Sequence, residues 1–199
     1  MSSPSEGLAI AGVILAAGAS RRMGTNKMLL PVEGEPMVRR TVRAALDAGL
    51  DPVVVVLGHE PDRARQALEG LACTFVESDD FTGPTSASLH AGLRALGAGT
   101  DAAVVLLGDM VRVSAPMIAT LARSARAGSA PLEVSRYGDI LAPPLLFRRA
   151  LWPELLAWTG EGCGKAVVRA HEGEAAMHDW PAAALQDVDT KADYEELTR

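Results

Sequence analysis

The sequence predicts an α/β fold, a three-layer α/β/α domain around a mostly parallel, doubly wound sheet. Short apolar runs such as Val53 to Leu57 and Ala102 to Leu107 alternate with longer segments whose apolar residues have helical spacing. Such unbroken apolar runs are typical of strands buried on both faces of a parallel sheet. With 199 residues, 48% of them hydrophobic, the chain is long enough for one well-buried domain and too short for two.

The first two thirds of the chain alternate regularly between strand and helix. Strands are expected at Leu8 to Leu15, Val53 to Leu57, Cys73 to Glu77 and Ala102 to Leu107, and helices at Pro36 to Ala48, Pro61 to Leu68, Thr85 to Leu96 and Pro116 to Ala127. The first helix has Pro36 near its start and Gly49 just past its end, which are favoured positions for these residues. This βαβαβαβα order predicts parallel strands.

The alternation becomes irregular after about residue 130. Strands are expected at Leu132 to Ser135, Ile140 to Phe147 and Ala175 to His178, and helices at Leu151 to Thr159, Lys165 to Ala170 and Lys191 to Leu197. The Pro143-Pro144 pair is expected to interrupt the second of these strands, because proline cannot donate to a sheet ladder. We expect a single domain over residues 1–199.

Charge and composition exclude several classes of protein. The net charge is −6, so binding of nucleic acid by bulk electrostatics is not expected. No apolar run approaches the roughly 18 to 20 residues of a membrane span, and Met1 to Glu6 lacks the basic start of a signal peptide. Cys73 and Cys163 lie far apart without metal-ligand spacing, which favours reduced thiols in the cytoplasm.

The segment Leu15 to Lys27 follows the first expected strand and predicts a phosphate-binding loop. Its small residues allow backbone N–H groups to approach phosphate oxygens, and Arg21, Arg22 and Lys27 supply positive charge. It is not a P-loop, because Gly18 and Gly24 are separated by one residue too many. It is not the dinucleotide fingerprint either, because serine stands where that motif needs its second glycine.

A carboxylate follows the strand Ala102 to Leu107, in Gly108-Asp109-Met110. Carboxylates at the exits of parallel strands face the binding crevice of doubly wound folds. Asp109 is therefore placed to hold a hard cation such as Mg²⁺, although turn formation alone is also compatible with an aspartate here.

Two further segments carry polar groups of interest. Asp187-Val188-Asp189-Thr190 places two carboxylates two residues apart, so an extended backbone would point both the same way; Thr190 is also suited to cap the last helix. Gly83 to Leu89 clusters hydroxyls at a helix start, where Ser86 and Ser88 either cap the helix or contact a ligand.

The run Leu15-Ala16-Ala17-Gly18-x-Ser20-x-Arg22-Met23-Gly24-x-x-Lys27 closely resembles the signature loop of GT-A-like, Rossmann-related nucleotidyltransferases. The nearest resemblance is to the molybdenum cofactor cytidylyltransferases of the MobA-like NTP transferase family. It implies catalytic roles for Arg22, Lys27 and Asp109. The implied nucleotide contacts are Leu15, Ala16, Ala17, Gly18, Ser20, Arg22, Gly24, Lys27, Ser86 and Ser88. The implied Mg²⁺ ligands are Asp109 and Asp187, with Asp189 as the alternate.

The same resemblance implies a cytoplasmic enzyme that transfers CMP from CTP to the phosphate of molybdopterin and releases pyrophosphate. It divides the chain into a nucleotide-binding half, about 8–130, and an acceptor-binding half, about 131–199, and implies a transient molybdoenzyme partner. Ala17 favours CTP, because the guanylyl branch more often has glycine there; GTP and ATP remain alternatives. Departures at Ala142 to Phe147 and at Glu161 to Lys165 leave other acceptors open, such as a sugar phosphate. A non-catalytic nucleotide-binding regulator is the alternative from another class.

Overall fold

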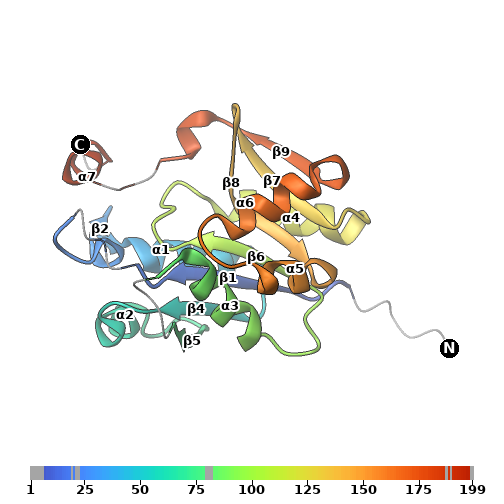
Figure 1. The fold of residues 1–199 in the computed structure, drawn as a ribbon. Helices are drawn as coiled ribbons and strands as arrows, with labels where there is room; N and C mark the ends of the chain where they lie inside the picture. Colours follow the sequence, from blue (N-terminus) through green and yellow to red (C-terminus); the bar gives the residue numbers. More distant parts are fainter. Residues whose placement is uncertain are drawn as a thin grey trace.

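The computed structural model describes residues 7–18, 20, 23–78, 83–186, 188 and 190–197, which form a seven-stranded sheet with helices on both faces (Figure 1). The order across the sheet is β5-β4-β1-β6-β8-β7-β9. The strands of this sheet are β1 (Ile10–Ala16), β4 (Val53–Leu57), β5 (Thr74–Glu77), β6 (Ala102–Leu107), β7 (Leu132–Tyr137), β8 (Ile140–Arg148) and β9 (Ala176–Trp180). The α-helices are α1 (Met37–Asp47), α2 (Pro61–Ala67), α3 (Thr85–Ala95), α4 (Ala115–Ala127), α5 (Trp152–Ala157), α6 (Cys163–Ala170) and α7 (Lys191–Leu197). The predicted α/β class is confirmed.

Alternate residues of the central strand β1 pack into two separate cores. Ile10 and Ile14 join the core covered by α1, α2 and α4, whereas Ala11 and Val13 join the core covered by α3, α5 and α6. This alternation follows from the period of two along a strand. A strand with apolar residues on both faces has no solvent side, and that explains the unbroken apolar runs in the sequence.

The sheet is mostly parallel, with one antiparallel strand. Strands β5, β4, β1 and β6 pair in parallel, and so do β7 and β9, while β8 runs antiparallel to both β6 and β7. A single strand of reversed direction thus joins the two parts of the chain into one sheet. The reversal follows from the β7–β8 hairpin, which a two-residue connection at Gly138 and Asp139 closes.

Pro143-Pro144 does not end its strand, since β8 continues from Ile140 to Arg148, but the pairing of β8 with β7 is interrupted at these residues as expected. The reason lies in its register with β7, where Val134 pairs with Leu145 and Arg136 pairs with Leu141. The ladder therefore skips residues 142–144, and the missing N–H groups of the two prolines leave no ladder bond unmade.

Several boundaries differ from the sequence prediction. The helix expected at Leu151 to Thr159 is a 3₁₀ turn (Arg149–Leu151) followed by the short α5, and β9 extends two residues beyond His178. The two-residue strands β2 (Pro31–Val32) and β3 (Glu35–Pro36), which form a separate hairpin, were not predicted. Within the described ranges, the helices are all too short or too polar to cross a bilayer.

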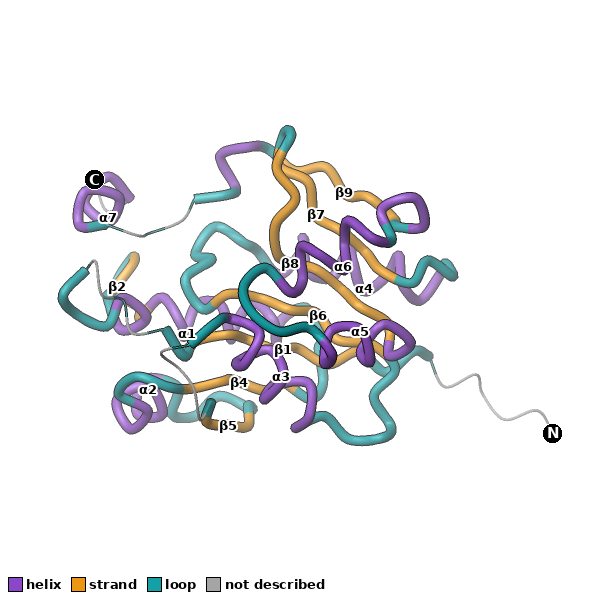
Figure 2. Tube along the Cα trace, viewed as in Figure 1, coloured by secondary structure: helices purple, strands orange, loops and turns teal. Residues whose placement is uncertain are grey.

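The parallel strands β4, β1 and β6 have their carboxyl ends on the same side of the sheet, and the loops that leave them lie together there (Figure 2). We call this side the carboxyl edge. Near this edge α7 lies beside β2, and the Tyr194 hydroxyl donates a hydrogen bond of 2.7 Å to the carbonyl of Pro31. A binding crevice is expected at such an edge of a doubly wound sheet.

Candidate active site

Lys27 and Asp109 meet at the carboxyl ends of β1 and β6. Lys27 Nζ lies 2.6 Å from Asp109 Oδ2, and the two side chains are only 13% and 9% exposed. The other carboxylate oxygen, Asp109 Oδ1, is buried and has no hydrogen-bond partner in the described part of the chain. A buried acceptor without a partner is costly, so its presence indicates a ligand or cation at this position.

Gly108 allows the turn after β6, which carries Asp109, to pack closely against Ala16 and Met28. A Cβ atom at this position would lie 3.0 Å from Met28 Sδ and 3.2 Å from the Ala16 Cβ. The Gly108 N–H donates to the carbonyl of Leu15 at 2.9 Å, and its carbonyl accepts from the Thr41 hydroxyl at 3.2 Å. These contacts fix the position from which the Asp109 carboxylate enters the crevice.

The opening loop is shaped by its own hydrogen bonds. Ser20 Oγ accepts from the backbone N–H of Lys27 at 3.1 Å, and the Ser20 carbonyl accepts from the N–H of Met23 at 2.9 Å. Gly24 has a φ of +68°, which an L side chain rarely adopts. Arg22 lies outside the described residues, so its role at the triphosphate stays a prediction.

Asn26 joins the opening loop to the loop after β4. Its side chain is 3% exposed; Oδ1 accepts from the Met28 N–H at 3.2 Å, and Nδ2 donates to the carbonyl of His59 at 3.2 Å. The first contact caps the 3₁₀ turn that begins at Lys27. Asn26 therefore links the turn that carries Lys27 to the loop after β4.

Replacing Asn26 by alanine is expected to destabilise the protein by about 2 kcal/mol, through the lost cap and the lost hydrogen bond to the His59 carbonyl. Urea denaturation measures this loss. Asn26→Ser is the matched control, because serine can still cap the turn but cannot reach His59, and it should lose about half as much. Equal stability of Asn26→Ala and the wild type would contradict the anchoring role.

Asp187 and Asp189 lie outside the described residues, but Val188 between them is described. Val188 is fully buried in a cluster with Met23, Val111 and Met37. The chain at residue 188 therefore passes beside the opening loop and beside the loop that follows Asp109. The expected cap of the last helix is present, because the N–H groups of Thr190 and Asp193 each donate to the other residue's side-chain oxygen, at 2.7 and 3.2 Å.

Ser86 and Ser88 lie inside α3 and do not cap it; the helix begins at Thr85, and its N-cap Pro84 makes no side-chain cap. Both serines are buried, at 3% and 7% exposure. Ser88 lines the first cavity, of about 200 Å³, together with Gly18, Lys27 and Asp109. Ser86 lines a second cavity, of about 270 Å³. Their contact with a nucleotide stays a prediction.

The second cavity adjoins the first, since Leu15, Thr85 and Leu107 line both. Its wall is mostly apolar, with Leu89, Val105, Pro143, Leu145, Phe147 and Cys163. The Thr85 hydroxyl donates to Glu161 Oε2 at 3.1 Å and so ties the loop before α6 to the start of α3. Sequence reasoning missed Thr85, because no local pattern pairs it with a residue 76 positions away.

Cys163 lies at the wall of this cavity, but its thiol is not suited to covalent catalysis. The residue is 3% exposed, and Sγ donates to the carbonyl of Leu155 at 3.3 Å. Burial raises the pKa of the Cys163 thiol, so the thiolate is disfavoured at neutral pH. The burial of Cys163 and the raised pKa of its thiol therefore indicate a structural role and not a catalytic one.

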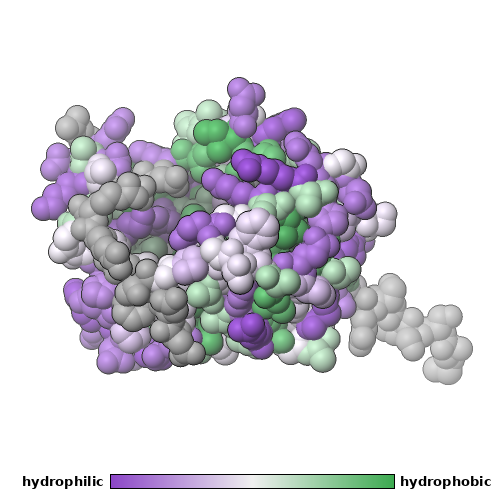
Figure 3. Space-filling model, in the orientation of Figure 1, coloured by the Kyte–Doolittle hydropathy of each residue, from purple (hydrophilic) through white to green (hydrophobic). Residues whose placement is uncertain are grey.

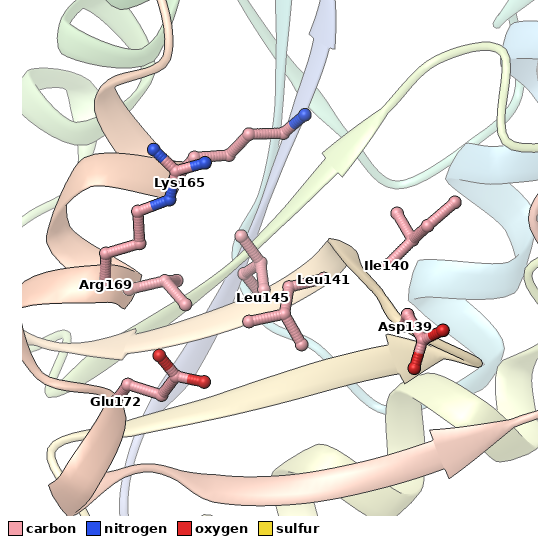
Figure 4. A pocket seen from close by; sticks show the side chains of 8 residues that line it. Asp139, Ile140, Leu141, Leu145, Lys165, Arg169 and Glu172 are labelled. Atoms are coloured by element: carbon pink, nitrogen blue, oxygen red, sulfur yellow. The ribbon is translucent and has the colours of Figure 1, made fainter.

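A third cavity, of about 330 Å³, continues from the second, because Leu145 and Lys165 line both (Figure 4). It lies between α6 and the β7–β8 hairpin. Figure 3 shows hydrophobic surface in the upper part of this face, where Figure 1 draws β7 and β8, and Ile140 in the hairpin is 54% exposed. The three cavities thus adjoin one another in a row that begins at Lys27 and Asp109, and we call this row the groove.

The residues present fit a divalent cation held by few protein ligands. Within residues 7–18, 20, 23–78, 83–186, 188 and 190–197, no three His, Cys, Asp or Glu side chains cluster as a metal site. Mg²⁺ usually needs only one or two carboxylates, because substrate phosphates and water complete its shell. The unpartnered Oδ1 of Asp109 is an oxygen of the required kind.

Residues 12–175 match the MobA-like NTP transferase domain. The chain belongs to this family of nucleotidyltransferases. It is similar to a probable molybdenum cofactor guanylyltransferase of Opitutus terrae, with 33% identity over 178 residues that cover 89% of this chain and 80% of the relative. The MobA-like fold also matches the crystal structure of Rv0371c from Mycobacterium tuberculosis, with a TM-score of 0.86, 28% identity and coverage of 96% and 98% of the two chains. A manganese complex of Rv0371c matches with a TM-score of 0.79, 26% identity and coverage of 96% and 98%.

Proposed function

We propose that this MobA-like NTP transferase transfers CMP from CTP to the phosphate of molybdopterin and releases pyrophosphate. The observation that carries the proposal is the buried pair of Lys27 and Asp109, whose second carboxylate oxygen has no partner among the described residues. Lys27 and Asp109 lie at the carboxyl ends of β1 and β6, where doubly wound folds bind their ligands. Phosphoryl transfer depends on a cation and on metal-binding carboxylates that neutralise charge at such a position.

In this mechanism the acceptor phosphate oxygen attacks the α-phosphorus of the nucleotide, and the bond to pyrophosphate breaks. The opening loop orients the triphosphate with its backbone N–H groups, while Lys27 and Arg22 neutralise negative charge. Asp109, with Asp187 or its alternate Asp189, would hold Mg²⁺, which supplies further charge neutralisation at the phosphates. The manganese complex of the similar Rv0371c supports a divalent cation in this fold.

The choice of nucleotide rests on the opening loop. Ala17 is 3% exposed and lines the first cavity beside Gly18. The resemblance to the cytidylyltransferases supports CTP, because the guanylyl branch more often has glycine where this chain has Ala17. GTP is the second candidate, favoured by the similarity to a probable guanylyltransferase.

The acceptor is proposed from the lining of the second cavity. Leu89, Val105 and Phe147 line the apolar part of that cavity, and a smaller polar part comes from Thr85, Ser86, Glu161 and Lys165. A mostly apolar wall with few polar groups suits the flat face of a heterocycle better than a sugar phosphate, most of whose surface carries hydroxyl groups.

Pyrophosphate release with Mg²⁺ tests the proposal. We expect release with CTP plus molybdopterin, and none from Lys27→Ala under the same conditions. GTP, ATP and sugar phosphates serve as the competing substrates. Faster release with GTP would overturn the choice of nucleotide, release with a sugar phosphate would overturn the acceptor, and no release from any combination would indicate a non-catalytic regulator.

A further inference from the structure

Two cations on α6 have no partner among the described residues. Lys165 and Arg169 are both exposed, and neither makes a hydrogen bond or an ion pair with a described side chain or backbone group. The other arginines described in this half of the chain have partners. Arg136 pairs with Asp179, and Arg148 and Arg149 donate to backbone carbonyls.

The positions of the two cations do not stabilise α6. They lie four residues apart on the same face of the helix, where like charges repel each other. Lys165 is the third residue of the helix, near the positive end of its dipole, where a cation is unfavourable. Only Arg169, in the last turn, has a favourable position. An anion bound between the two side chains would remove this repulsion.

Both side chains line the third cavity, whose floor is formed by Leu141, Leu145 and Val168. Figure 4 shows the Arg169 guanidinium directed to the same side of α6 as Lys165 and away from the carboxylate of Glu172. Asp139 stands on the opposite wall. The positive charge of the cavity therefore lies where the Lys165 and Arg169 side chains come together, apart from the carboxylates of Asp139 and Glu172, so an anion is expected between these two cations.

These two cations line the groove that leads to the reacting groups. Lys165 and Leu145 line both the third and the second cavity, and the second cavity adjoins the one that contains Lys27 and Asp109. A ligand lying along the groove can therefore reach Asp109 with one end and α6 with the other.

We propose that Lys165 and Arg169 bind a second anionic group of the acceptor, distinct from the phosphate that attacks the nucleotide. This inference rests on the proposed function for the identity of the acceptor. It specifies the acceptor class as a molecule with a planar body that fills the second cavity and with a second anionic group besides the reacting phosphate. Arg169 and Lys165 select the acceptor and take no part in the chemical step.

The anion site is tested with inorganic phosphate as the probe, by ¹H–¹⁵N NMR titration of the Lys27→Ala protein, in which phosphate binding at the opening loop is weakened. We expect the amide signals of α6 to shift with phosphate, and the apparent Kd to rise about tenfold in Arg169→Gln, as expected for a lost charge-assisted hydrogen bond. Arg126→Gln is the matched control, because Arg126 is also exposed in the last turn of a helix and has no partner in the described residues. Unshifted α6 signals, or equal Kd values in Arg169→Gln and Arg126→Gln, would overturn the site.

Steady-state kinetics link the site to the acceptor. In Arg169→Gln we expect the KM for the acceptor to rise about tenfold, with kcat and the KM for the nucleotide unchanged and partial rescue in Arg169→Lys. A protein that turns over no acceptor refutes the proposed function, while the phosphate titration still decides the anion site. Turnover with an unchanged acceptor KM refutes the second anionic group alone.

Discussion

Asp109→Asn is expected to lower kcat by about 10²- to 10³-fold while the fold stays intact, the scale seen when one charge-stabilising group is removed from an active site. Asparagine keeps the shape of the side chain but removes its charge. Asp109 Oδ2 lies 2.6 Å from Lys27 Nζ, and Oδ1 has no partner among the described residues, so the amide would weaken both the contact to lysine and the cation-binding oxygen. Pyrophosphate release measures the loss.

Two measurements separate this catalytic effect from a structural one. Asp62→Asn on α2 is the control for loss of one negative charge, because the side chain of Asp62 is 98% exposed and lines none of the three cavities, and it should keep full turnover. Binding of Mn²⁺ alone, followed by electron paramagnetic resonance, should weaken in Asp109→Asn and not in Asp62→Asn. Near-wild-type turnover of Asp109→Asn would contradict the role proposed for this carboxylate.

The parts of the fold that the sequence predicted are those set by local patterns. Val53 to Leu57 and Ala102 to Leu107 match β4 and β6 to the residue, because unbroken apolar runs between turn residues have one interpretation at that length. The course of β8 through Pro143 and Pro144 was not predictable in this way. It depends on a register irregularity opposite β7, and register is fixed by tertiary pairing.

The same distinction applies to the candidate site. Lys27 and Asp109 were both selected from the sequence, and the structure brings them together, because neighbouring parallel strands end at the same edge of the sheet. The bond between Thr85 and Glu161 was not predictable, since it depends on how the loop before α6 packs against α3. Polar contacts between distant loops leave no periodicity in a sequence.

Lys27→Met is expected to destabilise the protein by about 3 kcal/mol, because breaking a buried ion pair leaves a buried charge without compensation. Asp109 is 7% exposed, and its second oxygen already lacks a partner among the described residues, so the remaining carboxylate has little access to water. Guanidinium denaturation at neutral pH measures this loss. A free energy of unfolding equal to that of the wild type would mean that the Asp109 carboxylate pairs with another cation or is hydrated in the variant.

The double variant Lys27→Met/Asp109→Asn is expected to recover most of that stability, because removing both charges leaves none buried and unpaired. Its turnover should stay as low as that of either single variant, since both groups act on the same phosphates. Stability therefore recovers with the second substitution, whereas activity does not. A pair kept for stability alone would not show this divergence, so the double variant distinguishes a structural ion pair from a catalytic one.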